Sequence, residues 1–113
     1  METVEKVALI KETLEDKKGI DVVTLSLSNI SSIADGFVIS SGTSEPHVKA
    51  LSDEVYEKMG KAGYSPLRVE GYNSAKWILM DYGDVIVHVF TKEAREFYNL
   101  EWLWADGKEE FRD

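Results

Sequence analysis

The chain has 113 residues, with 21 acidic and 13 basic side chains and a formal net charge of −8. This charge disfavours direct binding to nucleic-acid phosphates or anionic lipid, and the absence of cysteine excludes disulfides, thiolate metal sites and cysteine nucleophiles. No apolar run is long enough to span a membrane, and the acidic N-terminus does not resemble a signal peptide. We therefore expect one soluble, cytoplasmic domain.

The N-terminal segment predicts an amphipathic helix over residues 3–18, because apolar residues recur every three or four positions and Gly19 follows as a stop. An alternating, β-branched run over residues 21–28 predicts the first strand. A polar connection at 29–35 leads to a second, mostly apolar strand over residues 36–41.

The second predicted helix has the strongest periodic pattern in the chain. Its apolar residues at steps of three and four are Val48, Leu51, Val55, Met59 and Ala62. Thr43 or Ser44 is the expected N-cap, Pro46 is tolerated in the first turn, and Gly63 follows the end. We expect this helix to cross over a sheet.

Three further strands are predicted over residues 66–71, 76–82 and 84–90. The last two flank Tyr82 and Gly83, which predict a two-residue hairpin turn with a positive φ at Gly83. Because these two strands are apolar on both faces, we expect them at the centre of a sheet that is covered on both sides.

Thr91 is the expected cap of a third helix ending at Tyr98, and residues 100–104 suggest one more helical turn. This order predicts a single α/β domain with a five-stranded mixed sheet flanked by helices, because parallel strands need a crossover connection. The domain is expected to cover residues 1–106, followed by a short charged tail at 107–113.

A magnesium-dependent nucleotidyltransferase using Ser44, Asp81 and Asp84 is one hypothesis for the function. A phosphate-binding loop would need a lysine that is missing here, and carboxylates on one strand face are spaced by two residues rather than three. The two aspartates more simply satisfy the backbone of the turn. We therefore expect no catalytic residue, cofactor or metal site, and keep the transferase as an alternative.

His47 and His88 are the two histidines of the chain. Neither has the additional ligands that a zinc site requires. His88 is expected to be a hydrogen-bonded residue on a sheet face, and His47 a first-turn residue near the loop at Gly42.

Aromatic residues are more frequent between Lys76 and Asp106 than one small core requires. They are Trp77, Tyr82, Phe90, Phe97, Tyr98, Trp102 and Trp104. Strand alternation places Trp77 on one face with Asp81, and Met80 with Tyr82 on the other. Because Trp and Tyr often dominate interface energetics, some of these rings are expected to face a partner. The acidic residues of the same segment favour a basic partner.

Three segments resemble the ribosomal silencing factor family, which is also called iojap-like. They are DGFVISSGTS at residues 35–44, WILMDYGDVIVHVF at 77–90 and REFYNLEWLWAD at 95–106. Together with shorter matches, the resemblance spans about residues 1–106.

The resemblance implies that the protein binds ribosomal protein uL14 on the large ribosomal subunit, blocks association with the small subunit and represses translation under nutrient limitation or in stationary phase. It also implies a nucleotidyltransferase-like fold without transferase activity, and frequent homodimers. The partner-binding residues carried over by position are Trp77, Met80, Asp81, Tyr82, Tyr98 and Trp104. An assembly factor for the large subunit would use the same docking surface and remains an alternative.

Overall fold

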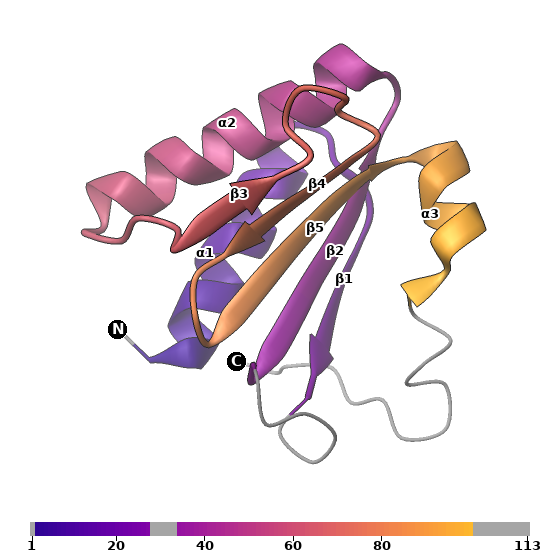
Figure 1. Cartoon of the computed structure of the whole chain (residues 1–113). Helices are drawn as coiled ribbons and strands as arrows, with labels where there is room; N and C mark the ends of the chain where they lie inside the picture. The colour runs from indigo at the N-terminus through magenta and orange to yellow at the C-terminus, as the bar shows by residue number, and fades with distance from the viewer. Residues whose placement is uncertain (1, 28–33, 101–113) are drawn as a thin grey trace.

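The computed structural model describes residues 2–27 and 34–100, and all eight predicted helices and strands are present in the predicted order (Figure 1). Their bounds are α1 Thr3–Asp16, β1 Ile20–Ser26, β2 Gly36–Gly42, α2 Glu45–Lys61, β3 Arg68–Glu70, β4 Trp77–Asp81, β5 Val85–Thr91 and α3 Lys92–Tyr98. The third strand is shorter than predicted. The tail, most of the 29–35 connection and, except for Leu100, the helical turn expected over 100–104 lie outside the described residues. Among the described helices, none has the length and apolar character needed to cross a membrane.

The five strands form one mixed sheet in the order β1-β2-β5-β4-β3. The central pair, β2 and β5, is parallel, and the other three pairs are antiparallel. The helix α2 follows β2 and carries the chain across the sheet to β3 at the far edge, as a crossover connection must. The prediction of a single α/β domain with a five-stranded mixed sheet is confirmed.

The turn between β4 and β5 is displaced by one residue from its predicted position. Asp81 pairs with Ile86, and the N–H of Tyr82 donates to the carbonyl of Val85 at 2.9 Å. The two loop residues are therefore Gly83 and Asp84, and Tyr82 extends the strand. Gly83 has the expected positive φ of 90°, which suits the first loop position of a tight hairpin.

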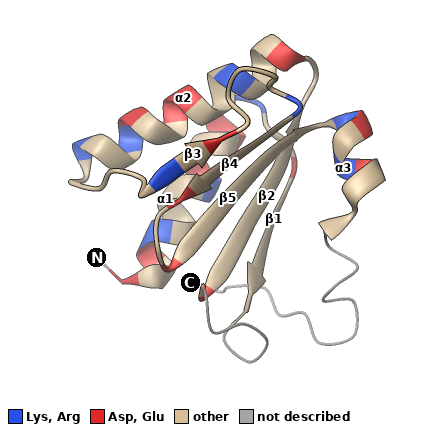
Figure 2. Cartoon of the chain, in the orientation of Figure 1, with Lys and Arg blue, Asp and Glu red and all other residues tan. Residues whose placement is uncertain are grey.

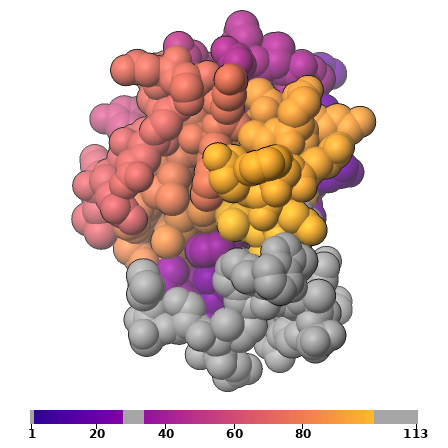
Figure 3. Space-filling view, turned by 45° about the vertical axis from the view of Figure 1, so that its right-hand side comes forward, coloured from indigo at the N-terminus to yellow at the C-terminus, as the bar shows by residue number. Residues whose placement is uncertain are grey.

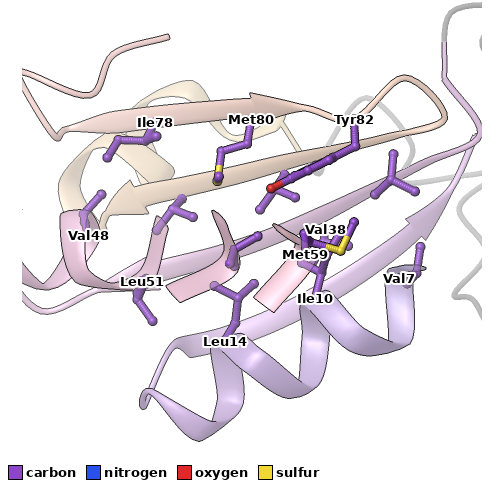
Figure 4. Close-up of a cluster of buried hydrophobic side chains, with 14 of the residues drawn as sticks. Val7, Ile10, Leu14, Val38, Val48, Leu51, Met59, Ile78, Met80 and Tyr82 are labelled. Carbon is purple, nitrogen blue, oxygen red and sulfur yellow. The ribbon is translucent and has the colours of Figure 1, made fainter. Parts of the chain in front are cut away.

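The main core lies between one face of the sheet and the helices α1 and α2, which both pack on that face (Figures 1 and 4). Side chains that point into it include Ile10, Leu14, Leu51, Val55, Ile78, Met80 and Tyr82. A second, smaller cluster on the opposite face includes Leu25, Ile39, Ile86 and Phe90, with Ala94 of α3 packed against it.

The helices therefore cover the two faces of the sheet unequally. Within the described part of the chain, α3 is the single helix on the second face, and it stands towards the β1 and β2 side (Figure 1). We predicted that β4 and β5 are covered on both faces, and on the face that packs against α1 and α2 they are fully covered. On the second face, Trp77 and Leu79 of β4 are still partly exposed.

The hairpin also fixes the position of α1 through Asp84. Its carboxylate accepts hydrogen bonds from Thr3 Oγ1 at 2.6 Å and from Lys6 Nζ at 3.0 Å. Burial raises the pKa of Asp84, but the hydrogen bonds from Thr3 and Lys6 and the Lys6 charge outweigh it, so the net pKa lies below its ordinary value. The predicted turn contact is found for Asp81, whose Oδ1 accepts from the Gly83 N–H, whereas Asp84 mainly holds α1.

Candidate functional site

Aromatic side chains gather on the second face of the sheet, beside α3. We call this surface the aromatic face and define it by Phe37, Trp77, His88, Phe90, Phe97 and Tyr98. The centroid of each of these rings lies within 5.1 Å of the centroid of another ring of the set. In Figure 3, the gold surface of α3 adjoins the orange surface of the β4 and β5 region.

Trp77 lies at the centre of the aromatic face and is partly exposed. Its ring stacks on Phe90 with centroids 5.1 Å apart and contacts Tyr98 at 4.6 Å. Its indole Nε1–H donates to His88 Nδ1 at 3.0 Å. The ring is therefore held from three directions while part of its surface reaches solvent.

The helix α3 adds the most exposed rings. Phe97 is 81% exposed and Tyr98 is 47% exposed, and their rings meet edge to face at 5.1 Å. Thr91 caps the helix as predicted, since its Oγ1 accepts from the Ala94 N–H. Arg95 ties α3 to the sheet, because its Nη1 donates to the carbonyl of Ile20 at 3.1 Å. The exposed rings thus stand on a helix with a fixed position.

Two of the predicted partner-binding residues lie on the core side of the sheet, away from the aromatic face. Met80 is 1% exposed and Tyr82 is 7% exposed, and both are buried beneath α1 and α2 (Figure 4). The alternation of strand residues places them opposite Trp77. They support β4 from within the core and present no binding surface in this structure. Trp104 lies outside the described residues.

Asp81 shares the face of Trp77, but its carboxylate already has partners. Oδ1 accepts from the Gly83 N–H at 2.8 Å, and Oδ2 lies 3.3 Å from Arg68 Nε. The nearby Arg68 also pairs with Glu70 at 2.8 Å. Asp81 and Glu70 therefore share one basic side chain, and Asp84 is paired with Lys6.

The centre of the sheet is free of charge. Neither β2 nor β5 contains Lys, Arg, Asp or Glu, so both strands are tan in Figure 2. On α3, Glu93 and Glu96 are exposed beside the aromatic face. Lys92 of α3 is exposed as well, so the face combines an uncharged, ring-lined centre with charged side chains of both signs at its margin.

Ser44, Asp81 and Asp84 do not form one site. Ser44 follows the end of β2 at Gly42, whereas Asp84 immediately precedes Val85, the partner of Gly36 at the other end of that strand. These ends are six positions apart along the strand, which corresponds to roughly 20 Å. Ser44 instead caps α2 by accepting from the His47 N–H. In the residues that the structure describes, no group of three or more His, Asp or Glu side chains could hold a metal ion.

Both histidines serve as structural hydrogen-bonding groups. His88 is a buried, hydrogen-bonded residue on a sheet face, as predicted. His47 lies in the first turn of α2, where its Nδ1 accepts from the Thr43 N–H at 2.9 Å. With Nδ1 as acceptor, its Nε2 donates to the carbonyl of Lys17 at 2.9 Å and so joins α2 to the end of α1.

Sequence reasoning missed two features of the site. It did not single out Phe97 from the other rings, because a seven-residue helix gives too little periodicity to tell its exposed side from its buried one. It also did not foresee the hydrogen bond between Trp77 and His88. That pair lies diagonally across β4 and β5 and follows only from the exact hairpin register.

The fold and this face define a small α/β domain with a partly exposed aromatic surface on one side of its sheet. A family model described as ribosomal silencing factor during starvation matches residues 1–113. The chain is 44% identical over 107 residues to the ribosomal silencing factor RsfS of Halalkalibacterium halodurans, covering 95% of this chain and 92% of that protein. It is 41% identical over 93 residues to the RsfS of Bacillus subtilis, covering 82% and 79%.

A solved structure agrees with these relatives. The crystal structure of a protein from Chromobacterium violaceum superposes with a TM-score of 0.91 at 38% identity, covering all of this chain and 94% of that one. The chain belongs to the ribosomal silencing factor family, as its resemblance indicated. The relatives are named for silencing and not for a reaction.

Proposed function

We propose that the protein binds the large ribosomal subunit through its aromatic face and thereby blocks association with the small subunit. Membership of the silencing factor family supports a role at the ribosome. The observation that carries the proposed site is the placement of Trp77, which is held by Phe90, Tyr98 and His88 yet partly exposed. Trp and Tyr in such settings are the residues that most often dominate binding energy.

The proposed partner within the subunit is ribosomal protein uL14. The net charge of −8 favours encounter with a basic protein surface. Silencing by steric exclusion requires occupancy and no chemistry, so we propose that the protein is not an enzyme. It would act in the cytoplasm, with a homodimer as a further state of the free protein.

The proposed docking residues differ in part from those expected from the sequence. Trp77 and Tyr98 remain, and Phe97 joins them because its ring is the most exposed of the aromatic face. Asp81 lies at the edge of the proposed docking surface. Trp104 is retained as a prediction.

Replacing Trp77 by alanine tests the docking site. Loss of an aromatic anchor typically costs about 2 kcal/mol or more, which corresponds to roughly a thirtyfold loss of affinity. Purified large subunits pelleted with increasing concentrations of wild-type or variant protein would measure this loss. Tyr56→Ala is a matched control, because Tyr56 is an exposed aromatic residue on α2, on the other side of the sheet.

We expect Trp77→Ala to release the subunit while Tyr56→Ala binds as the wild type does. Circular dichroism should show both variants folded. Co-sedimentation of a folded Trp77→Ala variant at wild-type affinity would refute the aromatic face as the docking site. Co-sedimentation restricted to precursor particles would indicate an assembly factor instead.

A further inference from the structure

His88 is a polar side chain at the centre of β5, with apolar residues on both sides of it in the strand. It lies on the middle strand β5, between Ile39 of β2 and Leu79 of β4, and is 3% exposed. Phe37 meets its ring edge-on with centroids 4.5 Å apart. Burying an imidazole in such surroundings is unfavourable unless a hydrogen bond compensates for the lost water.

The hydrogen bond of His88 is made to Trp77. An indole N–H is always a donor, so His88 Nδ1 must be unprotonated and act as the acceptor. The proton of the neutral ring is then on Nε2, which is buried and has no hydrogen-bond partner among the residues that the structure describes. Burial lowers the pKa of His88 to about 4, so the acceptor persists at neutral pH.

This arrangement costs stability that an apolar residue would not. A buried donor without a partner is unfavourable, and a leucine at this position would remove it. The compensation lies in the single acceptor atom that His88 directs at Trp77. Without that atom, Trp77 would keep its ring contacts with Phe90 and Tyr98 but lose the bond that fixes its polar edge.

We infer that His88 is a positioning residue, whose Nδ1 holds the indole of Trp77 in the orientation that the large ribosomal subunit binds. The inference rests on the proposed function. Holding the ring before binding removes the entropy cost of ordering it afterwards. His88 itself is buried and makes no contact with the partner.

Two substitutions separate the acceptor atom from the shape of the side chain. His88→Leu is apolar and lacks an acceptor. His88→Asn places its amide oxygen two bonds from Cβ, where the histidine has Nδ1, and so can accept the same indole N–H. The Trp77→Phe background, which has a ring but no N–H, completes a double-mutant cycle.

Affinity for purified large subunits and the Nε1–H resonance of Trp77 in nitrogen-15 NMR spectra are the two measurements. That resonance is identified by its absence from Trp77→Phe. We expect His88→Leu to weaken binding about three- to tenfold and to shift the indole resonance upfield. His88→Asn should restore most of both, and His88→Leu should have no further effect in the Trp77→Phe background.

The inference is overturned if His88→Leu binds as tightly as the wild type, or if Leu and Asn weaken binding equally. It is also overturned if His88→Leu has the same effect with and without the indole N–H. Thermal unfolding of each variant controls for loss of fold. Failure of the wild-type protein to bind large subunits would instead remove the proposed function, and this inference with it.

Discussion

At the scale of single residues, one type of side chain takes different roles according to its neighbours. Asp81 and Asp84 flank Gly83, and the sequence suggested that both stabilise the turn. Asp81 does so, through the Gly83 N–H. Asp84 reaches Thr3 and Lys6, which are about eighty positions away in the chain, and no local pattern could predict that contact.

The buried His88 makes stability depend on pH. Its pKa falls from 6.5 to about 4 on folding because of burial. The unfolded chain takes up a proton near pH 6.5 that the folded protein resists until about pH 4, so stability decreases as the pH falls through this window. The shift corresponds to roughly 3 kcal/mol lost by pH 4.

Urea unfolding of the wild type and of His88→Leu between pH 7 and pH 4 would measure this contribution. We expect the free energy of unfolding to fall less steeply in the variant, because the group that takes up the proton is gone. The lowered pKa of Asp84 acts at lower pH and is the same in both proteins. Parallel curves for the two proteins would contradict this account of His88.

At the scale of elements, periodicity was sufficient to predict every helix and strand of the described chain. The apolar stripe of α2 and its Ser44 cap follow directly from the sequence. The register of the hairpin did not, because a turn at Tyr82 and Gly83 and one at Gly83 and Asp84 are both plausible for a tight turn with one glycine. The two registers differ by two positions across the strands, so they place Trp77 on the same face.

The packing of the helices could not be predicted from local patterns. Three helices and a five-stranded sheet are compatible with several distributions over the two faces. The observed one, with α1 and α2 together, depends on contacts between distant segments, such as the Asp84 bonds to α1. This distribution decides that Met80 and Tyr82 are core while Trp77 is partly exposed.

The loop before β4 determines the position of Trp77, the first residue of that strand. Gly71 has a φ of 79°, and a Cβ added there would collide with the backbone carbonyl oxygen of Trp77. We expect Gly71→Ala to cost about 1–2 kcal/mol for the positive φ and a further amount for displacing β4. Binding to the large subunit should fall as well, because the displacement moves Trp77.

Gly63→Ala is the matched control for this prediction. Gly63 has a φ of 96°, and a Cβ there would meet nothing within 4 Å. Gly63→Ala should lose stability because of the positive φ but should bind the large subunit as the wild type does. Thermal unfolding and subunit pelleting of both variants would make the comparison. Equal behaviour of the two variants would show that Gly71 does not determine the position of Trp77.

At the scale of the whole molecule, the unequal covering of the sheet creates the surface on which the proposed function depends. Two helices bury one face completely enough to form the main core. The other face keeps partly exposed rings beside the uncharged strands β2 and β5, with charged side chains of both signs on α3 next to them. Such a surface suits docking onto a protein, and within the described residues the candidate catalytic groups lie at opposite ends of the sheet.

The central claim is that the bound protein prevents the two ribosomal subunits from joining. Light scattering after mixing purified large and small subunits measures their association directly. With large subunits first saturated by the wild-type protein, we predict that the increase in scattering is strongly reduced, and that Trp77→Ala at the same concentration leaves it unchanged. Association at the normal rate and extent in the presence of saturating wild-type protein would contradict the account.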